Sequence, residues 1–284
     1  MDLFLQEYHP ECHSSIVFIH GGGIGSWMWD PQVAYFNDYH CIVPDLPAHG
    51  KSVHVPLRSV PDMAKMIADL IRQKAHGGKA HVVGLSLGAQ VTVALLSIAP
   101  ELVDHAVVSS ALLRDMAMKW LYSPGFIRFL FRWGFEPFKN SRAYIWINMK
   151  AKPTIPMKYF KNVFEDNRHY TVDTFTALMA ANQGFLMPAG LEKVHAPVLI
   201  TAGEKEFKVM KQSAADLLAV LPNARAIIVD PQGKLPMGCE HAWNINLPEL
   251  FNQAVEAWLH DRPLPDQFGE LPESKNKIGN LDEK

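Results

Sequence analysis

Residues 84–88 read Gly-Leu-Ser-Leu-Gly and stand between a strand-like run, residues 79–83, and a run with helical character. A strand that turns directly into a helix must bend sharply, and the two glycines remove the Cβ atoms that would clash in such a bend. The bend also pushes the hydroxyl of Ser86 out above the end of the strand. The motif therefore predicts a strand, a tight turn and a helix, with an accessible serine between them.

A glycine run and a late histidine accompany this serine. Residues 20–23 read His-Gly-Gly-Gly after the apolar run 16–19, and His241 lies far downstream in a loop that contains glycine. A serine hydroxyl is a weak nucleophile until an imidazole accepts its proton, and that imidazole needs a carboxylate to orient it. His241 and His260 are the last two of the thirteen histidines, and a solvated helix end explains His260. We predict that His241 is the general base for Ser86.

The composition excludes several classes of protein. The 284 residues are 48% hydrophobic and 20% charged, which is typical of a globular protein with a large core. A formal net charge of −2 gives no basis for a nucleic-acid partner. The chain has neither a signal-like start nor an apolar window of 18 residues, so we expect a cytoplasmic protein without stable membrane association. Its three cysteines lack C-x-x-C spacing, which predicts neither a disulfide framework nor a metal site.

Short β-branched runs alternate with helical patterns along the chain, which predicts an α/β fold with parallel strands joined by crossover helices. The clearest helix begins near Ser59, with Asp62 as a capping acid. The apolar spacing of this helix predicts that it buries Met63, Met66, Ile67, Leu70 and Ile71. The predicted strands are residues 15–19, 41–43, 80–83, 105–109, 198–202 and 224–229.

Residues 112–190 interrupt this alternation with helical, aromatic-rich sequence and no clear strand. We interpret them as a helical cap inserted into a core domain formed by residues 1–111 and 191–261. Residues 262–284 are rich in proline and charge with few large apolar side chains, so we expect a disordered tail. The aromatic side chains of the cap either roof an apolar pocket or pack the cap onto the core; they are Trp120, Tyr122, Phe126, Phe129, Phe131, Trp133, Phe135 and Phe138.

Taken together, the serine motif, the glycine run and the loops after the predicted strands resemble those of the α/β-hydrolase superfamily. The resemblance spans about residues 15–260 and implies a mostly parallel sheet flanked by helices, with a triad in the chain order serine, acid, histidine. It implies that Ser86 is the nucleophile, and a helical cap over the site. The matching pieces are residues 20–23 with Trp27 and Trp29, residues 44–52, the motif at 84–88, residues 203–206 and residues 241–244.

The resemblance implies an acid a few residues past the strand at 198–202, where this chain has Glu206. Family members usually have aspartate there, so the backbone or the rotamer must absorb one extra methylene. We favour Glu206, with Glu204, or Asp115 after the preceding strand, as alternatives. An exposed ion pair with the neighbouring lysines would be a purely structural use of Glu206.

The resemblance also implies an oxyanion hole built from two backbone N–H groups. One comes from the residue after the nucleophile, Leu87, and the other from the His-Gly loop, here Gly22. Asp45 and His49 lie in the loop after the strand at 41–43 and look catalytic. In the family this segment shapes a turn near the floor of the site, so we expect structural roles for both.

We therefore expect a serine hydrolase that cleaves a small to medium apolar carboxylic ester through an acyl-enzyme, without a metal or an organic cofactor. The triad predicts the class of reaction, whereas the choice of an ester rests on analogy with the fold. Lactone, thioester and carbon–carbon bond hydrolysis use the same machinery. The alternative from another class is a ligand-sensing or signalling protein on this fold that turns over slowly.

Overall fold

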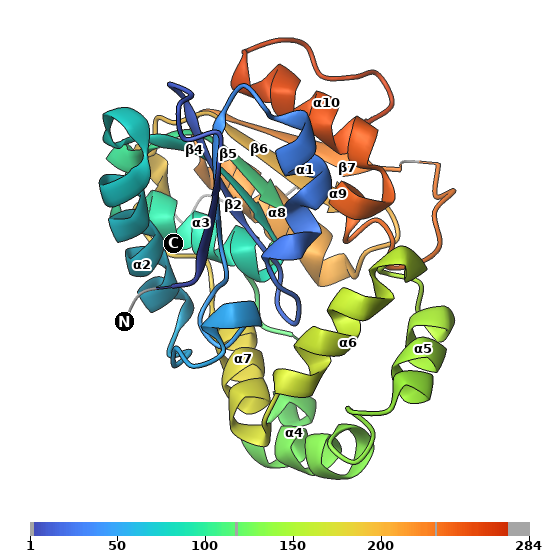
Figure 1. Cartoon of the computed structure of the whole chain (residues 1–284). Helices are drawn as coiled ribbons and strands as arrows, with labels where there is room; N and C mark the ends of the chain where they lie inside the picture. The colour runs from blue at the N-terminus through green and yellow to red at the C-terminus, as the bar shows by residue number, and fades with distance from the viewer. Residues whose placement is uncertain (1–2, 117–118, 231, 272–284) are drawn as a thin grey trace, which may run out of the picture.

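The computed structural model describes residues 3–116, 119–230 and 232–271, and a sheet of eight strands runs through this part of the chain (Figure 1). The strand order is β1-β3-β2-β4-β5-β6-β7-β8, and only the edge strands β1 and β8 pair antiparallel with their neighbours. This topology confirms the predicted fold class. The strands are β1 Leu5–Tyr8, β2 Ser15–Ile19, β3 His40–Pro44, β4 Ala80–Leu85, β5 Val103–Ser109, β6 Val198–Gly203, β7 Ala224–Val229 and β8 Gly269–Glu270.

All six predicted strands are present, within two residues of their predicted bounds. They are detectable because a parallel strand covered on both faces is a continuous apolar run, as in β2, where every residue is buried. The sequence does not predict the two edge strands. β1 is only half-buried along its length and β8 has two residues, so neither carries a strong apolar signal.

Helices cover both faces of the sheet, as Figure 1 shows. The core on one face includes side chains of α2, α3 and α8, and the core on the other face includes side chains of α1, α9 and α10. Two packed layers around a parallel sheet are the usual way to bury its two apolar faces. These helices are α1 Asp30–Tyr35, α2 Val60–Lys74, α3 Leu87–Ile98, α8 Lys208–Val220, α9 Trp243–Asn246 and α10 Pro248–Leu259.

Helix α2 begins where the capping pattern predicts. The hydroxyl of Ser59 accepts a hydrogen bond from the backbone N–H of Asp62 at 3.2 Å. The helix buries three of the predicted side chains, whereas Met66 and Leu70 are only half-buried. Small residues extend the buried face in their place, and the fully buried set is Val60, Met63, Ala64, Ile67, Ala68 and Ile71.

The two glycines of the motif at 84–88 allow very close packing of β4, α3 and β2. A Cβ atom on Gly84 would lie 2.3 Å from the carbonyl oxygen of Gly88. A Cβ atom on Gly88 would lie 2.0 Å from the carbonyl oxygen of Ile19 and 2.8 Å from that of His20. Backbone atoms cannot move aside as a flexible side chain can. These glycines therefore fix the start of α3 against the end of β2, where the loop at residues 20–23 begins.

We expect Gly88→Ala to lower the free energy of unfolding by about 3 kcal/mol or more, because the new methyl group overlaps backbone on β2. Gly125→Ala is the matched control, since Gly125 lies in a helix and has no atom within 4 Å of its added Cβ position. That change should alter stability by no more than about 1 kcal/mol, in the stabilising direction. Urea denaturation of both variants measures the difference. Equal stability of the two variants would contradict the close contact.

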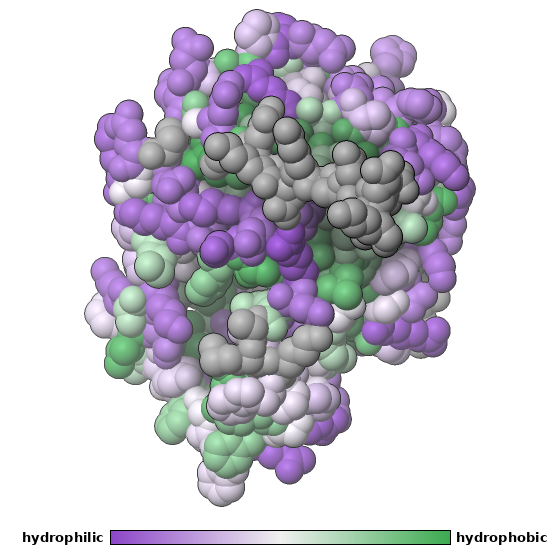
Figure 2. Space-filling view, turned by 180° about the vertical axis from the view of Figure 1, so that it is seen from behind, coloured by the Kyte–Doolittle hydropathy of each residue, from purple (hydrophilic) through white to green (hydrophobic). Residues whose placement is uncertain are grey.

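Between β5 and β6 the described residues form helices joined by turns and loops, with no strand, and we call residues 119–184 the helical insertion. In Figure 1 it lies below the sheet, and its last helix reaches α3 of the core, where Asn182 and Gln90 share hydrogen bonds. Figure 2 shows its far end, at the bottom of the view, as mostly pale to green surface with purple at the edges. Its elements are η5 Lys119–Tyr122, α4 Pro124–Leu130, the π-helical turn η6 Phe131–Phe135, α5 Arg142–Ala151, η7 Met157–Tyr159, α6 Phe160–His169 and α7 Val172–Gly184.

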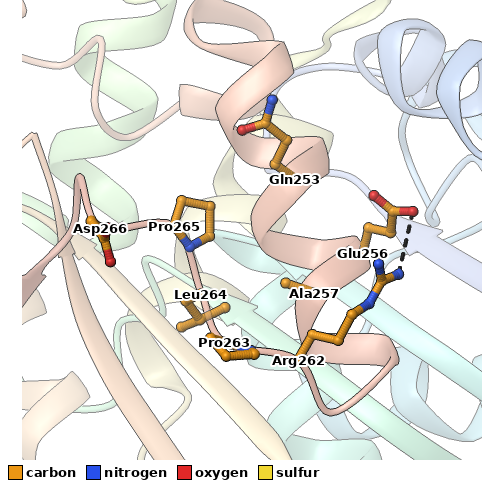
Figure 3. Close-up of a pocket in the computed structure, with 8 residues that line it drawn as sticks. All are labelled: Gln253, Glu256, Ala257, Arg262, Pro263, Leu264, Pro265 and Asp266. Carbon is orange, nitrogen blue, oxygen red and sulfur yellow. Dashed lines mark hydrogen bonds and ion pairs between the residues drawn. The ribbon is translucent and has the colours of Figure 1, made fainter.

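The first part of the expected disordered tail is ordered, which corrects that prediction for residues 262–271. The chain turns after α10 and folds back beside it, where Arg262 pairs with Glu256 at 3.5 Å across a shallow pocket (Figure 3). Leu264 and Leu271 are buried. Strand β8 then pairs with β7. A few apolar residues suffice to order this segment because the rest of the protein already provides the surface that buries them. Residues 272–284 of the expected tail lie outside the described residues.

None of the helices in the described ranges is both long enough and apolar enough to cross a lipid bilayer.

Candidate active site

Ser86 stands at the sharp bend between β4 and α3. Its backbone has φ 57° and ψ −112°, a conformation that is strained for any residue other than glycine. Its N–H donates to the carbonyl oxygen of Ser109 at 2.8 Å, which anchors the bend to β5. The side chain does not cap α3, although Ser86 holds the N-cap position. Its hydroxyl is therefore available at the wall of a cavity.

His241 and Glu206 are joined by a short hydrogen bond. The Nδ1 atom of His241 lies 2.6 Å from Oε1 of Glu206, and the Glu206 side chain is only 5% exposed. Burial alone would raise the pKa of this carboxyl, but the hydrogen bond and charge of His241 outweigh burial and hold the pKa below its ordinary value. An ionised carboxylate on Nδ1 leaves Nε2 of the imidazole free to accept a proton.

A turn after β6 absorbs the extra methylene of glutamate. The second carboxylate oxygen of Glu206 folds back and accepts the N–H of Gly203 at 2.9 Å. A Cβ atom on Gly203 would lie 3.2 Å from Cγ of Glu206 and 2.5 Å from Cβ of Glu240. Glycine at this position thus makes room for the longer side chain to curl and still reach His241.

The two alternative acids lie elsewhere. Glu204 is exposed and its carboxylate lies 3.4 Å from Nζ of Lys211, which is a surface ion pair. Asp115 is exposed in the segment after β5. The carboxylate that the structure brings to His241 is that of Glu206.

One cavity of about 470 Å³ brings the sequence-predicted catalytic residues together. Ser86, Glu206 and His241 all line it, although they lie after β4, after β6 and in the loop before α9. The rest of the wall is mainly apolar, with Asn182, Gln183 and Lys205 among its polar or charged members. The remaining lining residues are Leu112, Met116, Tyr122, Thr154, Phe207, Val209, Met210, Met237 and Gly238.

Gly22 and Leu87 lie side by side, as an oxyanion hole requires. A Cβ atom on Gly22 would lie 3.7 Å from Cβ of Leu87. Leu87 is the first residue of α3, and the N–H groups of a first helical turn have no acceptor within their own helix. The start of a helix also carries a partial positive charge that stabilises an anion. Both predicted backbone donors are thus next to Ser86.

Two buried histidines hold the loop at residues 20–23 in place. His20 accepts the N–H of Leu46 on Nε2 at 2.9 Å, with Nδ1 2.8 Å from the carbonyl oxygen of Gly21. His49 accepts the N–H of Gly23 on Nε2 at 3.1 Å. Burial lowers the pKa of both imidazoles, to about 3 for His49, so both stay neutral and act as fixed hydrogen-bond partners.

Asp45 is buried and accepts two backbone N–H groups, from Ser26 at 2.7 Å and Lys51 at 2.8 Å. Its carboxylate thereby joins the loop after β2 to the loop after β3. A carboxylate occupied by two backbone donors shapes these loops and does not face a substrate.

Sequence reasoning missed Asp166, which ties the helical insertion to the loop after β2. Asp166 on α6 accepts the backbone N–H of Gly25 at 2.9 Å and the indole N–H of Trp27 at 2.7 Å. Burial is the main reason that its pKa is raised to about 6. The sequence carries no signal for this contact, because about 140 residues separate the partners and α6 shows no motif.

Sequence reasoning also missed Glu240, which is fully buried next to His241. Its Oε2 accepts the backbone N–H of Lys205 at 2.7 Å and so fixes the turn that carries Glu206. Burial raises the pKa of this carboxyl. Adjacent Cys239 donates its thiol to the carbonyl oxygen of Pro153 at 2.9 Å, and burial raises its pKa as well, which makes it a poor nucleophile.

Among the described residues, three side chains outside the cavity bring possible metal-ligating atoms within 4.8 Å of one another: His81, Asp104 and His105. They lie at the amino-terminal ends of β4 and β5, whereas Ser86 follows the carboxyl end of β4. The chemistry of the cavity therefore does not draw on them.

Comparison with known proteins agrees with this geometry. A sequence profile described as the alpha/beta hydrolase family matches residues 16–262. This chain belongs to the alpha/beta hydrolase family. An AB hydrolase superfamily protein of Gibberella zeae is 27% identical over 276 residues, which are 95% of this chain and 88% of the relative. A carboxylesterase of Bacillus subtilis is 26% identical over 268 residues, 88% of this chain and 81% of the relative.

A solved structure shares the α/β-hydrolase fold over nearly its full length. It is a thermophilic esterase from Thermogutta terrifontis, with a TM-score of 0.71 and 17% sequence identity. The superposition covers 91% of this chain and 93% of the esterase. At this identity the likeness establishes the fold alone.

Proposed function

We propose that this α/β-hydrolase is a serine hydrolase that cleaves a small to medium apolar carboxylic ester through an acyl-enzyme. The observation that carries the proposal is the 2.6 Å hydrogen bond between Glu206 and His241, at a cavity that Ser86 also lines. Ser86 attacks the ester carbonyl while His241 accepts its proton and then passes it to the leaving alcohol. Water then attacks the acyl carbon while His241 accepts its proton; the bond to Oγ of Ser86 breaks, the carboxylic acid leaves, and His241 returns the proton to Ser86.

The N–H groups of Gly22 and Leu87 hold the negative charge that develops on the carbonyl oxygen. Their position beside each other at the start of α3 supports this role. The helical insertion acts as a cap, since Tyr122 and Asn182 come from it and line the cavity. The apolar wall supports a substrate with an apolar acyl or alcohol group.

The names of the relatives favour hydrolysis over the ligand-sensing alternative, because one of them is named a carboxylesterase. A series of p-nitrophenyl esters tests the proposal directly. We expect turnover of apolar acyl groups, and a kcat/KM at least about tenfold lower for an acyl group of similar size that ends in a carboxylate. Fluorophosphonate labelling without turnover of any ester, thioester or lactone would instead support a sensor.

The pH dependence of kcat/KM follows from the pair of Glu206 and His241. Burial by itself lowers the pKa of His241, but the hydrogen bond and charge of Glu206 outweigh it and raise the pKa above 6.5. The imidazole must be neutral to accept a proton, so we expect kcat/KM to fall as the pH falls through this raised pKa. In Glu206→Gln the carboxylate charge is gone, and the acid limb should move to lower pH. An acid limb at the same pH in both proteins would contradict the pairing.

A further inference from the structure

Large exposed apolar side chains are concentrated on the helical insertion. Seven of them lie between residues 120 and 147, and each is between 46% and 73% exposed. In Figure 2 this end of the molecule is mostly pale to green. We call these seven residues the insertion face: Trp120, Phe129, Leu130, Trp133, Phe138, Trp146 and Ile147.

Neither a pocket roof nor packing onto the core accounts for the insertion face. The inner side of α4 and of the π-helical turn does pack, with the rings of Phe131 and Phe135 5.3 Å and 6.4 Å from that of Phe175 on α7. Phe129 and Trp133 lie on the outer side and are 57% and 73% exposed. Exposure of this many large apolar groups in one region is unusual for a surface without a binding role.

The same region is strongly basic. Residues 120–161 contain eight lysines and arginines and a single acidic residue, Glu136, although the whole chain has a net charge of −2. Seven of the eight basic side chains are exposed, and one of these seven, Arg128, pairs with Asp173 on α7 at 2.7 Å. Lys150 lies 5.6 Å from the ring centre of Trp146, so charge and aromatic surface are interleaved. Several elements of the helical insertion thus combine exposed aromatic groups with exposed basic groups.

We propose that the insertion face adsorbs reversibly to an anionic lipid surface. Tryptophan and phenylalanine side chains favour the boundary between head groups and acyl chains, and nearby basic side chains are attracted to anionic lipids. The face is uncovered and its charge complements such a surface. This adsorption is reversible and sensitive to salt, and so differs from the stable membrane association that the sequence argued against.

Adsorption through this face would bring the cavity close to the lipid. Trp120 of the insertion face is two residues from Tyr122, which lines the cavity, and the cavity residues Phe207 and Met237 are 72% and 74% exposed. An apolar ester concentrates in lipid rather than in water. This delivery step rests on the proposed function, whereas adsorption itself does not.

Co-sedimentation with vesicles tests the proposal. We use phosphatidylcholine vesicles alone and vesicles with about one third phosphatidylglycerol, each at low and at high salt. The full chain should bind the anionic vesicles at low salt, and at least about tenfold more weakly at high salt or without phosphatidylglycerol. Ser86→Ala should bind equally well, which separates adsorption from the proposed catalysis.

Paired variants assign the binding to the insertion face. The double variant Phe129→Ser and Trp133→Ser, and the double variant Arg132→Gln and Lys150→Gln, should each weaken binding about tenfold or more. Matched controls change exposed residues on core helices, namely Ile98→Ser on α3 and Lys65→Gln on α2, and should bind normally. Thermal melts check that every variant is folded.

Three results would overturn the proposal. The first is no binding to anionic vesicles at low salt, and the second is equal binding by the Phe129 and Trp133 double variant. The third is a dimer of the unaltered chain in sedimentation velocity, with the same double variant monomeric and neither of the two proteins bound to vesicles. In that case a second copy of this chain covers the insertion face.

Discussion

Ser86→Ala is expected to reduce ester turnover by about 10⁵-fold or more and to abolish labelling by a fluorophosphonate probe. In the proposed mechanism this hydroxyl supplies the atom that forms the acyl-enzyme, so its removal takes away the group that attacks the ester. The fold should be unaffected, because the side chain makes no cap to α3 and the backbone N–H still bonds to Ser109. Active-site titration and steady-state kinetics measure the loss.

Ser97→Ala is the matched control, since Ser97 lies near the far end of α3 and its hydroxyl bonds to the carbonyl oxygen of Ala189. It should keep normal turnover and normal labelling. Persistent labelling of Ser86→Ala would mean that another residue is the nucleophile, and the assignment of the motif at 84–88 would be wrong.

Glu206→Gln is expected to lower kcat by about 10³- to 10⁴-fold with a smaller effect on KM. The amide keeps the shape of the side chain and retains an acceptor for the N–H of Gly203. The amide has no charge to stabilise the protonated imidazole of His241. It also lacks the carboxylate that keeps the proton of the neutral imidazole on Nδ1. The loss therefore arises in the transition state and appears in kcat.

Glu204→Gln distinguishes the two neighbouring acids. Glu204 is exposed and pairs with Lys211, and such surface pairs contribute little, so turnover should stay within about threefold of normal. An inactive Glu204→Gln beside a nearly normal Glu206→Gln would show that the hydrogen bond at 2.6 Å is not the one used in catalysis. Thermal melts of both variants exclude loss of folding as the cause.

The central strands and the bend at Ser86 are predictable from the sequence because their signals are local. A strand buried on both faces must be apolar along its length, as β2 and β6 are. The bend needs glycine at 84 and 88 because the backbone of α3 comes into contact with Gly84 and the end of β2 comes into contact with Gly88. With an acid after β6, the order serine, acid, histidine likewise narrows thirteen histidines to two candidates.

Other features depend on contacts between distant residues and have no local signal. The aromatic residues of the insertion illustrate this, since Phe131 packs on α7 while Trp133, two residues later, is 73% exposed. Asp166 and Glu240 are polar residues without a motif, and their roles become visible only where they meet Trp27 and Lys205. The ordering of residues 262–271 likewise depends on a surface formed by the rest of the protein.

The sequence by itself determined the class of fold, the six central strands and the candidates Ser86, Glu206 and His241. It did so because buried parallel strands and a tight strand-to-helix bend demand particular residue types at short range, and because the resemblance to the α/β-hydrolases implies where the acid and the histidine follow the serine. Only the tertiary structure decided which carboxylate meets His241, which polar groups anchor the loops, and which aromatic side chains remain in water. Those outcomes depend on distances of a few ångströms between segments far apart in the chain, and such distances arise only when the whole core packs.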